Sequence, residues 1–281
     1  MDSSMAENNE SDKKPLYIFL HLPKNGGASL NRNVRKKLPK ESFLGNEEEL
    51  QILTWEQKDK IKYIAGHGFY YGIHKYFPNR EPRYIVFIRD PAERRTSQYN
   101  HDIARLQEKR KHKKLPSFKK WYRLQIKDEQ TFLLNKKFRG IPGRKAPHFT
   151  NKIQKMLKIG KSKSLKIMGY KTLRIYDTLR KNRRHKEREL ENAKSLLNNC
   201  WFVSITKNLD EDIPKIFQEM GLDTKWERYR SAKNKGEKTS KEKYEVTKKF
   251  ELDNKTRQII YKDNPYDLKL YEYAKSLNKR I

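Results

Sequence analysis

The chain has almost no cysteine and no long apolar run. Cys200 is the only cysteine among 281 residues, which excludes an internal disulfide and a metal site built from several cysteines. No stretch free of Asp, Glu, Lys and Arg is longer than that from Ser195 to Thr206, which still contains two Asn. A membrane-spanning helix needs about 20 mostly apolar residues, so none is expected.

The N-terminal residues lack the features of a secretory signal. The sequence MDSSMAENNESDKK is polar and partly acidic, with neither a basic start nor an apolar core. Residues 1–14 are therefore expected to form a disordered tail ahead of one domain over 15–281. With no signal and no membrane span, the expected location is cytoplasmic.

Acidic residues are scarce relative to basic ones. The chain holds 66 Lys and Arg against 35 Asp and Glu, a net charge of +31. Only 35% of residues are hydrophobic, yet 11% are aromatic, and disordered chains are poor in aromatics, so the chain is expected to fold. The charge has two interpretations: a polyanionic partner, either nucleic acid or an acidic glycan, or basic residues spread over a solvated surface.

Short apolar runs predict buried strands, and helical patterns follow them. The strands are expected at residues 16–22, 62–65, 83–88 and 200–205, with a further short one at 165–168. Helices are expected over 28–38, 54–61, 91–110, 118–138, 187–197, 209–220, 244–261 and 265–277, and loops over 139–146 and 231–243. Apolar strands that alternate with helices predict an α/β fold, a parallel sheet flanked by helices.

The first motif with chemical character lies between the first strand and the first helix and reads PKNGGASL, from Pro23 to Leu30. Two glycines let main-chain N–H groups approach an anion, and the helix start adds free N–H donors and the positive end of its dipole. Lys24 supplies a mobile cation and Ser29 a hydroxyl. The Walker A order, in which Lys follows the second Gly, is absent. The pattern predicts an anion-binding loop, with a plain strand-to-helix turn as the alternative.

The second motif, Arg89-Asp90-Pro91-x-x-Arg94-x-x-Ser97, leaves the strand at 83–88 and enters a helix. Ligands of open α/β sheets gather at the carboxyl ends of strands. Arg89 can offer a phosphate two parallel N–H donors, and Ser97 can turn its hydroxyl toward the same group. The alternative is an Arg paired with Asp90 or Glu93 and a solvated Ser.

The third motif, GHGFYYG, places His67 between two glycines ahead of the strand at 83–88. Histidine can act as a general base near neutral pH. His74 is the alternative base. His21, on the first strand, is interpreted as a packed core or turn histidine.

Together these motifs resemble the sulfotransferase family that includes the heparan-sulfate 2-O- and 6-O-sulfotransferases and their bacterial relatives. The resemblance rests on FLHLPKNGGASL, GHGFYYG and YIVFIRDPAERRTSQYNH, and weaker similarity continues through DEQTFL, WFVSITKNLDEDI and NPYDLKLYEYA. It implies a fold like that of the P-loop-containing nucleoside triphosphate hydrolases. It also implies transfer of a sulfuryl group from 3′-phosphoadenosine 5′-phosphosulfate (PAPS) to a hydroxyl group, with no metal required.

The resemblance assigns roles residue by residue. His67 would take the proton of the acceptor hydroxyl, and Lys24 would also offset charge on the leaving phosphate. Arg89 and Ser97 would bind the 3′-phosphate of the donor. The 5′-phosphosulfate would be held by Lys24, Gly26, Gly27, Ala28, Ser29 and Leu30.

The chain departs from the family pattern in two places. The loop commonly reads PKTGGTS, with Thr where this chain has Asn25 and Ala28, and Lys207-Asn208 stand where relatives often carry Glu-Arg. Ala28 lacks a hydroxyl that could donate to the 5′-phosphate. An inactive relative that only binds the nucleotide is therefore an alternative to the enzyme.

The expected acceptor is a carbohydrate hydroxyl, with an anionic glycan favoured by the net charge. One alternative is a kinase or NTPase that uses the same loop, and the missing Walker A order argues against it. A second is a basic nucleic-acid-binding protein without catalysis. Only the charge supports that one, because no zinc-finger, KH or RRM signature is present.

Overall fold

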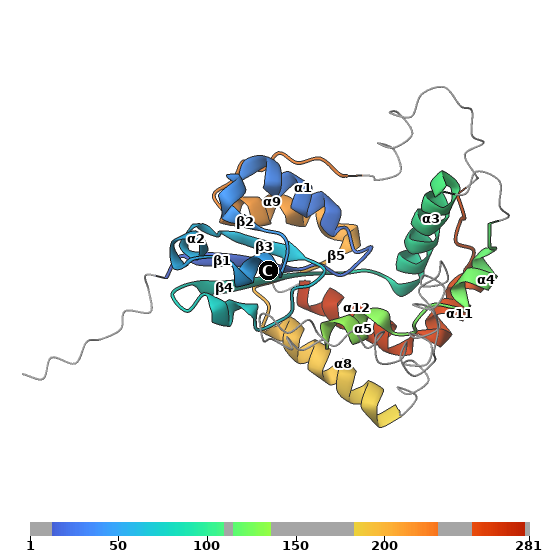
Figure 1. Cartoon of the computed structure of the whole chain (residues 1–281). Helices are drawn as coiled ribbons and strands as arrows, with labels where there is room; N and C mark the ends of the chain where they lie inside the picture. Colours follow the sequence, from blue (N-terminus) through green and yellow to red (C-terminus); the bar gives the residue numbers. More distant parts are fainter. Residues whose placement is uncertain (1–12, 110–114, 136–182, 230–248, 279–281) are drawn as a thin grey trace, which may run out of the picture.

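The computed structural model describes residues 13–109, 115–135, 183–229 and 249–278. These residues form a parallel five-stranded sheet in the order β2-β3-β1-β4-β5. Helices cover both of its faces (Figure 1), so the expected α/β fold is confirmed. The strands are β1 (Pro15–Leu20), β2 (Phe43–Leu44), β3 (Tyr63–Gly66), β4 (Glu81–Ile88) and β5 (Phe202–Ile205).

The central strands contribute to a separate core on each face of the sheet. In β1, Leu16, Ile18 and Leu20 pack into one apolar cluster, while Tyr17 and Phe19 pack into another. Successive side chains of a strand point to opposite faces, and helices on both faces must be met by apolar residues. This is why the sequence of β1 shows a continuous apolar run rather than an alternating one.

The helices form two layers and a lateral group. Helices α1 (Gly27–Lys37) and α9 (Leu209–Glu219) lie on one face, and α5 (Glu129–Leu134), α8 (Arg183–Asn198) and α12 (Pro265–Asn278) lie on the other (Figure 1). Helices α3 (Pro91–Lys109), α4 (Phe118–Tyr122) and α11 (Asn254–Asp263) share a third apolar cluster. Short elements complete the fold: α2 (Trp55–Lys60), η2 (Lys40–Ser42), η3 (Glu49–Gln51), η4 (Ile73–Tyr76) and η5 (Thr206–Asn208).

Two of the expected helices are wrong in extent. Residues 118–135, the described part of the helix expected over 118–138, form two short helices, because Asp128 adopts a left-handed φ of 51° just before α5. In the described part of the helix expected over 244–261, residues 249–253 are not helical, and α11 begins at Asn254, where the carboxylate of Asp253 accepts from the N–H of Thr256 at 2.7 Å and caps it. The two-residue strand β2 was not predicted. The expectations for 1–12, 139–146, 165–168 and 231–243 lie outside the described residues.

The sheet order brings two loops together. Strands β1 and β4 are direct neighbours, and Leu20 pairs with Val86 at their carboxyl ends. From β1 the chain turns through α1 toward β2, whereas β5 lies on the other side of β4. Ligands of open α/β sheets bind where the chain directions diverge in this way. The loops after β1 and β4 are therefore the expected walls of a site. Among the helices in the described ranges, none is long and apolar enough to cross a membrane.

Candidate functional site

The loop between β1 and α1 is shaped by two left-handed residues. Lys24 has a φ of 70° and Gly26 a φ of 85°, a backbone region that favours glycine. Gly27 is required for a different reason: a Cβ there would overlap the ring atoms of His21 and Phe19. The two glycines thus let the chain turn sharply and let α1 start directly against the end of the sheet.

The start of α1 presents main-chain donors. Within the described residues, the N–H groups of Gly26, Gly27 and Ala28 meet no acceptor, as expected of a first helical turn. Ala28 is exposed. The hydroxyl oxygen of Ser29 accepts from the N–H of Tyr229 at 3.0 Å, which leaves its own O–H available to donate. Leu30 has a completely buried side chain, so only its main chain could contribute to a site.

Positive charges converge behind this loop. Burial and the nearby charge of Arg89 lower the pKa of Lys24, and burial also lowers that of Arg89. Arg89 donates from Nη1 to the carbonyl oxygen of Lys24 at 3.1 Å, while its buried Nε has no hydrogen-bond partner. Glu93 lies 3.8 Å from both Arg89 and Lys207, too far for a strong pair. Such a cluster of partly desolvated cations favours binding of an anion.

A buried ion-pair group supports the loop from α3. Arg94 donates from Nε to the carbonyl oxygen of Pro23 at 3.1 Å. Glu129 accepts from Arg94 at 2.9 Å and from Arg95 at 2.7 Å. Burial alone would raise the pKa of Glu129, but the two guanidinium groups outweigh it and lower that pKa to about 2. The group therefore carries a net positive charge next to the loop.

Asp90 serves as a helix cap rather than as a partner of Arg89. Its carboxylate accepts from the N–H groups of Ala92 and Glu93, both at 2.9 Å, at the start of α3. The hydroxyl of Tyr261 donates to the other carboxylate oxygen at 2.5 Å.

Ser97 is partly buried one turn after Arg94, and residues three apart share a helix face. Ser97 thus lies on the face of α3 whose Arg94 reaches the loop.

Two histidines stack beside the glycine loop. The rings of His21 and His67 lie 4.2 Å apart, and His21 stacks in turn on Phe19. Nδ1 of His67 lies 3.0 Å from the carbonyl oxygen of His21. A carbonyl oxygen can only accept, so Nδ1 carries the proton and Nε2 keeps a free lone pair. His67 is exposed, and its free nitrogen suits a general base.

His21 is neutral in this arrangement. Burial and the neighbouring His67 lower its pKa to about 3. Its Nδ1 accepts from Asn31 at 3.3 Å, and Asn31 in turn accepts from the hydroxyl of Tyr63 at 2.8 Å. His74, the alternative base, is bound elsewhere: its Nδ1 lies 2.8 Å from the hydroxyl of Tyr84. The structure thus brings His67 and His21, but not His74, to the start of α1.

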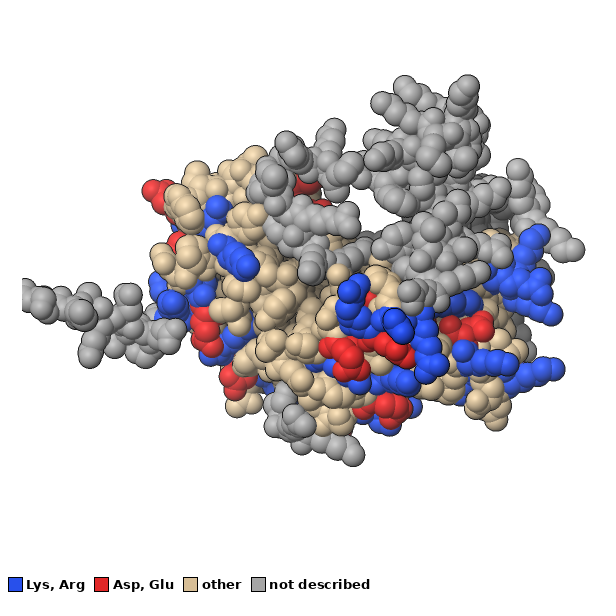
Figure 2. Space-filling view, turned by 90° about the horizontal axis from the view of Figure 1, so that it is seen from below, with Lys and Arg blue, Asp and Glu red and all other residues tan. Residues whose placement is uncertain are grey.

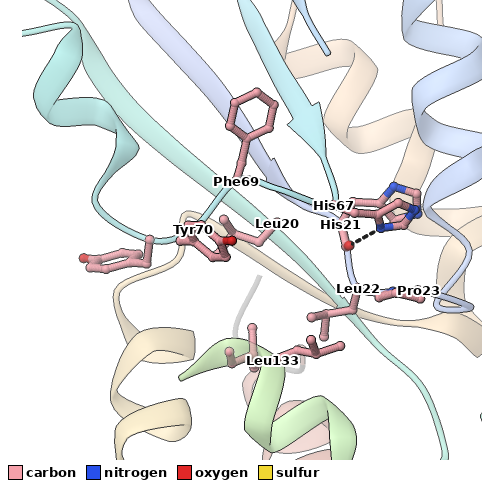
Figure 3. Close-up of a pocket in the computed structure, with 10 residues that line it drawn as sticks. Leu20, His21, Leu22, Pro23, His67, Phe69, Tyr70 and Leu133 are labelled. Carbon is pink, nitrogen blue, oxygen red and sulfur yellow. Dashed lines mark hydrogen bonds between the residues drawn. The ribbon is translucent and has the colours of Figure 1, made fainter. Parts of the chain in front are cut away.

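A small apolar pocket opens at the end of β1. Its volume is about 130 Å³. Figure 3 shows the imidazoles of His21 and His67 side by side and turned away from Leu133. No Lys or Arg lines it among the described residues. The lining residues are Leu20, His21, Leu22, Pro23, His67, Phe69, Tyr70, Tyr71, Leu133 and Leu134.

Sequence reasoning missed a residue that joins the two predicted motifs. The side chain of Gln130, at the start of α5, is fully buried and bonds to Asn25 and to the main chain of Arg89. It lies 105 residues from Asn25, and a single Gln follows no pattern. The similarity of DEQTFL to the family was the one available signal.

The described surface is not uniformly basic. Figure 2, which views the molecule from below, shows acidic side chains interspersed among the basic ones. The described residues contain no group of three or more His, Cys, Asp and Glu that could hold a metal ion.

The chain is similar to known proteins in sequence pattern and in fold. The search of curated proteins finds no match. Among solved structures, a sulfotransferase from Alicyclobacillus acidocaldarius aligns with 13% identity and a TM-score of 0.39, over 95% of this chain and 97% of that one. The model of the Sulfotransferase family matches residues 12–274. That match includes both walls of the site and the stacked histidines, and the chain therefore belongs to the sulfotransferase family.

Proposed function

We propose that this protein transfers a sulfuryl group from PAPS to a hydroxyl group of a carbohydrate. The observation that carries the proposal is the partly desolvated cation pair Lys24 and Arg89 beside a glycine turn with free N–H groups. A donor with phosphate groups at both its 5′ and 3′ positions would need two such anion sites. PAPS supplies the activated sulfuryl group, and no metal ion is assigned a role.

The residues of the loop fit the 5′-phosphosulfate. The N–H groups of Gly26, Gly27 and Ala28 and the hydroxyl of Ser29 would bind its oxygens, and Leu30 would add at most its main chain. Lys24 would stabilise the charge that builds on the leaving phosphate oxygen. Positioned donors and charges of this kind supply most of the catalysis in group transfer between oxygens.

The loop after β4 fits the 3′-phosphate. Arg89 has a buried Nε without a hydrogen-bond partner, and such a donor is costly unless a ligand or water satisfies it. Ser97, in the second turn of α3, would donate its hydroxyl to the same phosphate. The absence of a Thr hydroxyl at Ala28 is offset by the main-chain donors on either side of it.

His67 would act as the general base. Its Nε2 lone pair would accept the proton of the acceptor hydroxyl, and the resulting cation would keep its Nδ1 bond to the carbonyl of His21. The pocket beside it supports an acceptor with an uncharged ring, because it is lined by leucines and aromatic residues. The apolar face of a sugar ring suits such a wall, and any acidic groups of a glycan would then lie outside it.

Calorimetric titration with adenosine 3′,5′-bisphosphate, the product form of the donor, tests the proposal. Micromolar binding is expected, with 5′-AMP and ATP binding at least about tenfold more weakly. The variant Arg89→Ala should lose the preference for the bisphosphate while keeping weak binding of 5′-AMP. Equal affinity for the bisphosphate and 5′-AMP would contradict the proposal, and tight magnesium-dependent ATP binding would point to a kinase or NTPase.

A further inference from the structure

One buried amide links the two proposed phosphate sites. Oε1 of Gln130 accepts from Nδ2 of Asn25 at 2.8 Å and from the N–H of Arg89 at 3.1 Å, while its Nε2 donates to the carbonyl oxygen of Arg89 at 2.8 Å. We propose that Gln130 is a positioning residue that fixes the spacing between the 5′- and 3′-phosphate sites. We call these three hydrogen bonds the Gln130 bridge. The inference rests on the proposed function, because it takes the two loops that the bridge joins to be the binding sites for the two phosphates of the donor.

The bonds of Gln130 restrict both ends of the bridge. Both polar groups of the Arg89 main chain are held by one amide, so this residue cannot rotate without breaking two hydrogen bonds. On the other side, Nδ2 of Asn25 donates to Gln130 and also to the carbonyl oxygen of Phe87 at 2.7 Å. Through Asn25, the loop after β1 is therefore hydrogen-bonded both to the end of β4 and to α5. This gives Asn25 a role, although relatives commonly carry Thr at this position.

The main chain around Gln130 is itself held by hydrogen bonds to α12. Its N–H donates to the carboxylate of Asp267 at 3.1 Å, and Thr131 donates to the same carboxylate from its N–H and its hydroxyl, both at 2.8 Å. Asp128 accepts in return from the N–H groups of Tyr266 and Asp267 at 2.9 and 3.2 Å. Helices α5 and α12 thus cap each other. A side chain fixed on such a support can transmit position to the loops it touches.

A fixed spacing has a measurable consequence for a ligand with two phosphates. When one phosphate is bound, the other is presented to its own site at high effective concentration, provided that the two sites stay at the right distance. A monophosphate gains nothing from that distance. Loosening the bridge should therefore weaken the bisphosphate far more than either monophosphate.

The test is calorimetric titration of Gln130→Met with adenosine 3′,5′-bisphosphate, 5′-AMP and 3′-AMP. The expected Kd for the bisphosphate rises about tenfold or more, while the Kd values for both monophosphates rise less than about threefold. Gln125→Met is the matched control, because Gln125 is also buried and its side-chain amide donates to the carbonyl oxygen of Trp121, four residues away in its own segment. It should leave all three Kd values unchanged, whatever it does to stability.

The outcomes separate the two proposals. If the wild-type protein shows no preference for the bisphosphate, the proposed function itself fails. If the wild type prefers it and Gln130→Met keeps the full preference, or weakens all three ligands equally, the positioning role is overturned. Should Gln130→Met not fold, Asn25→Ser takes its place. It removes the loop half of the bridge, and the same selective loss of bisphosphate affinity decides the result.

Discussion

The Nδ1 atom of His67 is held by the main-chain carbonyl of His21, 3.0 Å away, and the two imidazole rings stack at 4.2 Å. One residue therefore fixes both the tautomer and the ring plane of the other. In this arrangement His67 is ready to accept a proton at Nε2 without first reorganising.

Replacing His67 with Ala is expected to lower turnover by about 10²–10⁴-fold, the range typical of a lost general base. The Kd for adenosine 3′,5′-bisphosphate should stay within about twofold, since the imidazole would contact the acceptor rather than the nucleotide. Steady-state rates with labelled PAPS and calorimetry measure the two quantities. His74→Ala is the control and should retain activity, because His74 is bound to Tyr84. Reversed effects would move the base to His74.

His21 predicts a pH dependence of stability. The pKa of His21 is about 3 in the folded protein, against an ordinary 6.5. Between these two pH values, the imidazole therefore binds a proton in the unfolded chain but not in the folded one. The free energy of unfolding should therefore fall as the pH drops from 6.5 toward 3. Urea unfolding at several pH values should show a steeper fall for the wild type than for His21→Gln. Parallel curves would argue that His21 titrates normally in the fold.

Gly27→Ala should damage the site through His21. The new methyl group would overlap the rings of His21 and Phe19, and overpacking of this kind costs about 1–3 kcal/mol of unfolding free energy. The larger effect is expected on the nucleotide, with a Kd about tenfold higher or more, because the start of α1 must shift. Gly221→Ala is the control: its φ is 66° but its surroundings are open. It should cost about 1 kcal/mol and leave the Kd unchanged.

Glu129→Gln should destabilise the protein strongly, by about 3–5 kcal/mol, because it leaves Arg94 and Arg95 buried without a countercharge. The exposed fractions of the two Arg side chains are only 1% each. Glu93→Gln, whose pairs are long and partly solvated, should cost less than about 1 kcal/mol. Chemical denaturation measures the free energy of unfolding of both variants. Similar losses would show that the buried ion pairs of Glu129 stabilise the fold no more than the partly solvated pairs of Glu93 do.

Acid should reproduce part of the Glu129→Gln effect. The pKa of Glu129 is about 2 in the fold and ordinarily 4.5, so its contribution to stability is complete above pH 4.5 and is lost as the pH falls toward 2. The acid-induced loss should be smaller in Glu129→Gln than in the wild type.

The sequence predicted those parts of the fold that are encoded locally. The apolar runs of β1, β4 and β5 follow from burial on both faces, and the glycine loop and the Arg89 turn follow from motifs of a few residues. Strand β2 was missed because two residues carry no periodicity. The break at Asp128 was missed because its left-handed φ depends on bonds to Asn264, Tyr266 and Asp267, which lie far away in the chain.

The candidate site likewise has a part that local sequence predicts and a part that depends on residues far apart in the chain. The placement of Lys24, Ser29, Arg89 and His67 at the carboxyl ends of β1, β3 and β4 could be expected from strand topology alone. The bridge through Gln130 could not, because an amide that bonds to main-chain atoms imposes no pattern on the residues it touches. The stacking of His67 on His21 likewise needs the pairing of β1 with β3.

The mutual capping of α5 and α12 also concerns the order in which the protein acquires activity during synthesis. Gln130 and Asp267 are 137 residues apart, and Ser29 and Tyr229 are 200 apart. A chain made from its N-terminus produces the glycine loop and Arg89 early, but the support that fixes their distance arrives only with α12. Contacts of such long sequence separation form late in folding. The nascent chain should therefore expose a basic, incompletely assembled loop region for much of its synthesis and bind nucleotide tightly only once α12 has docked.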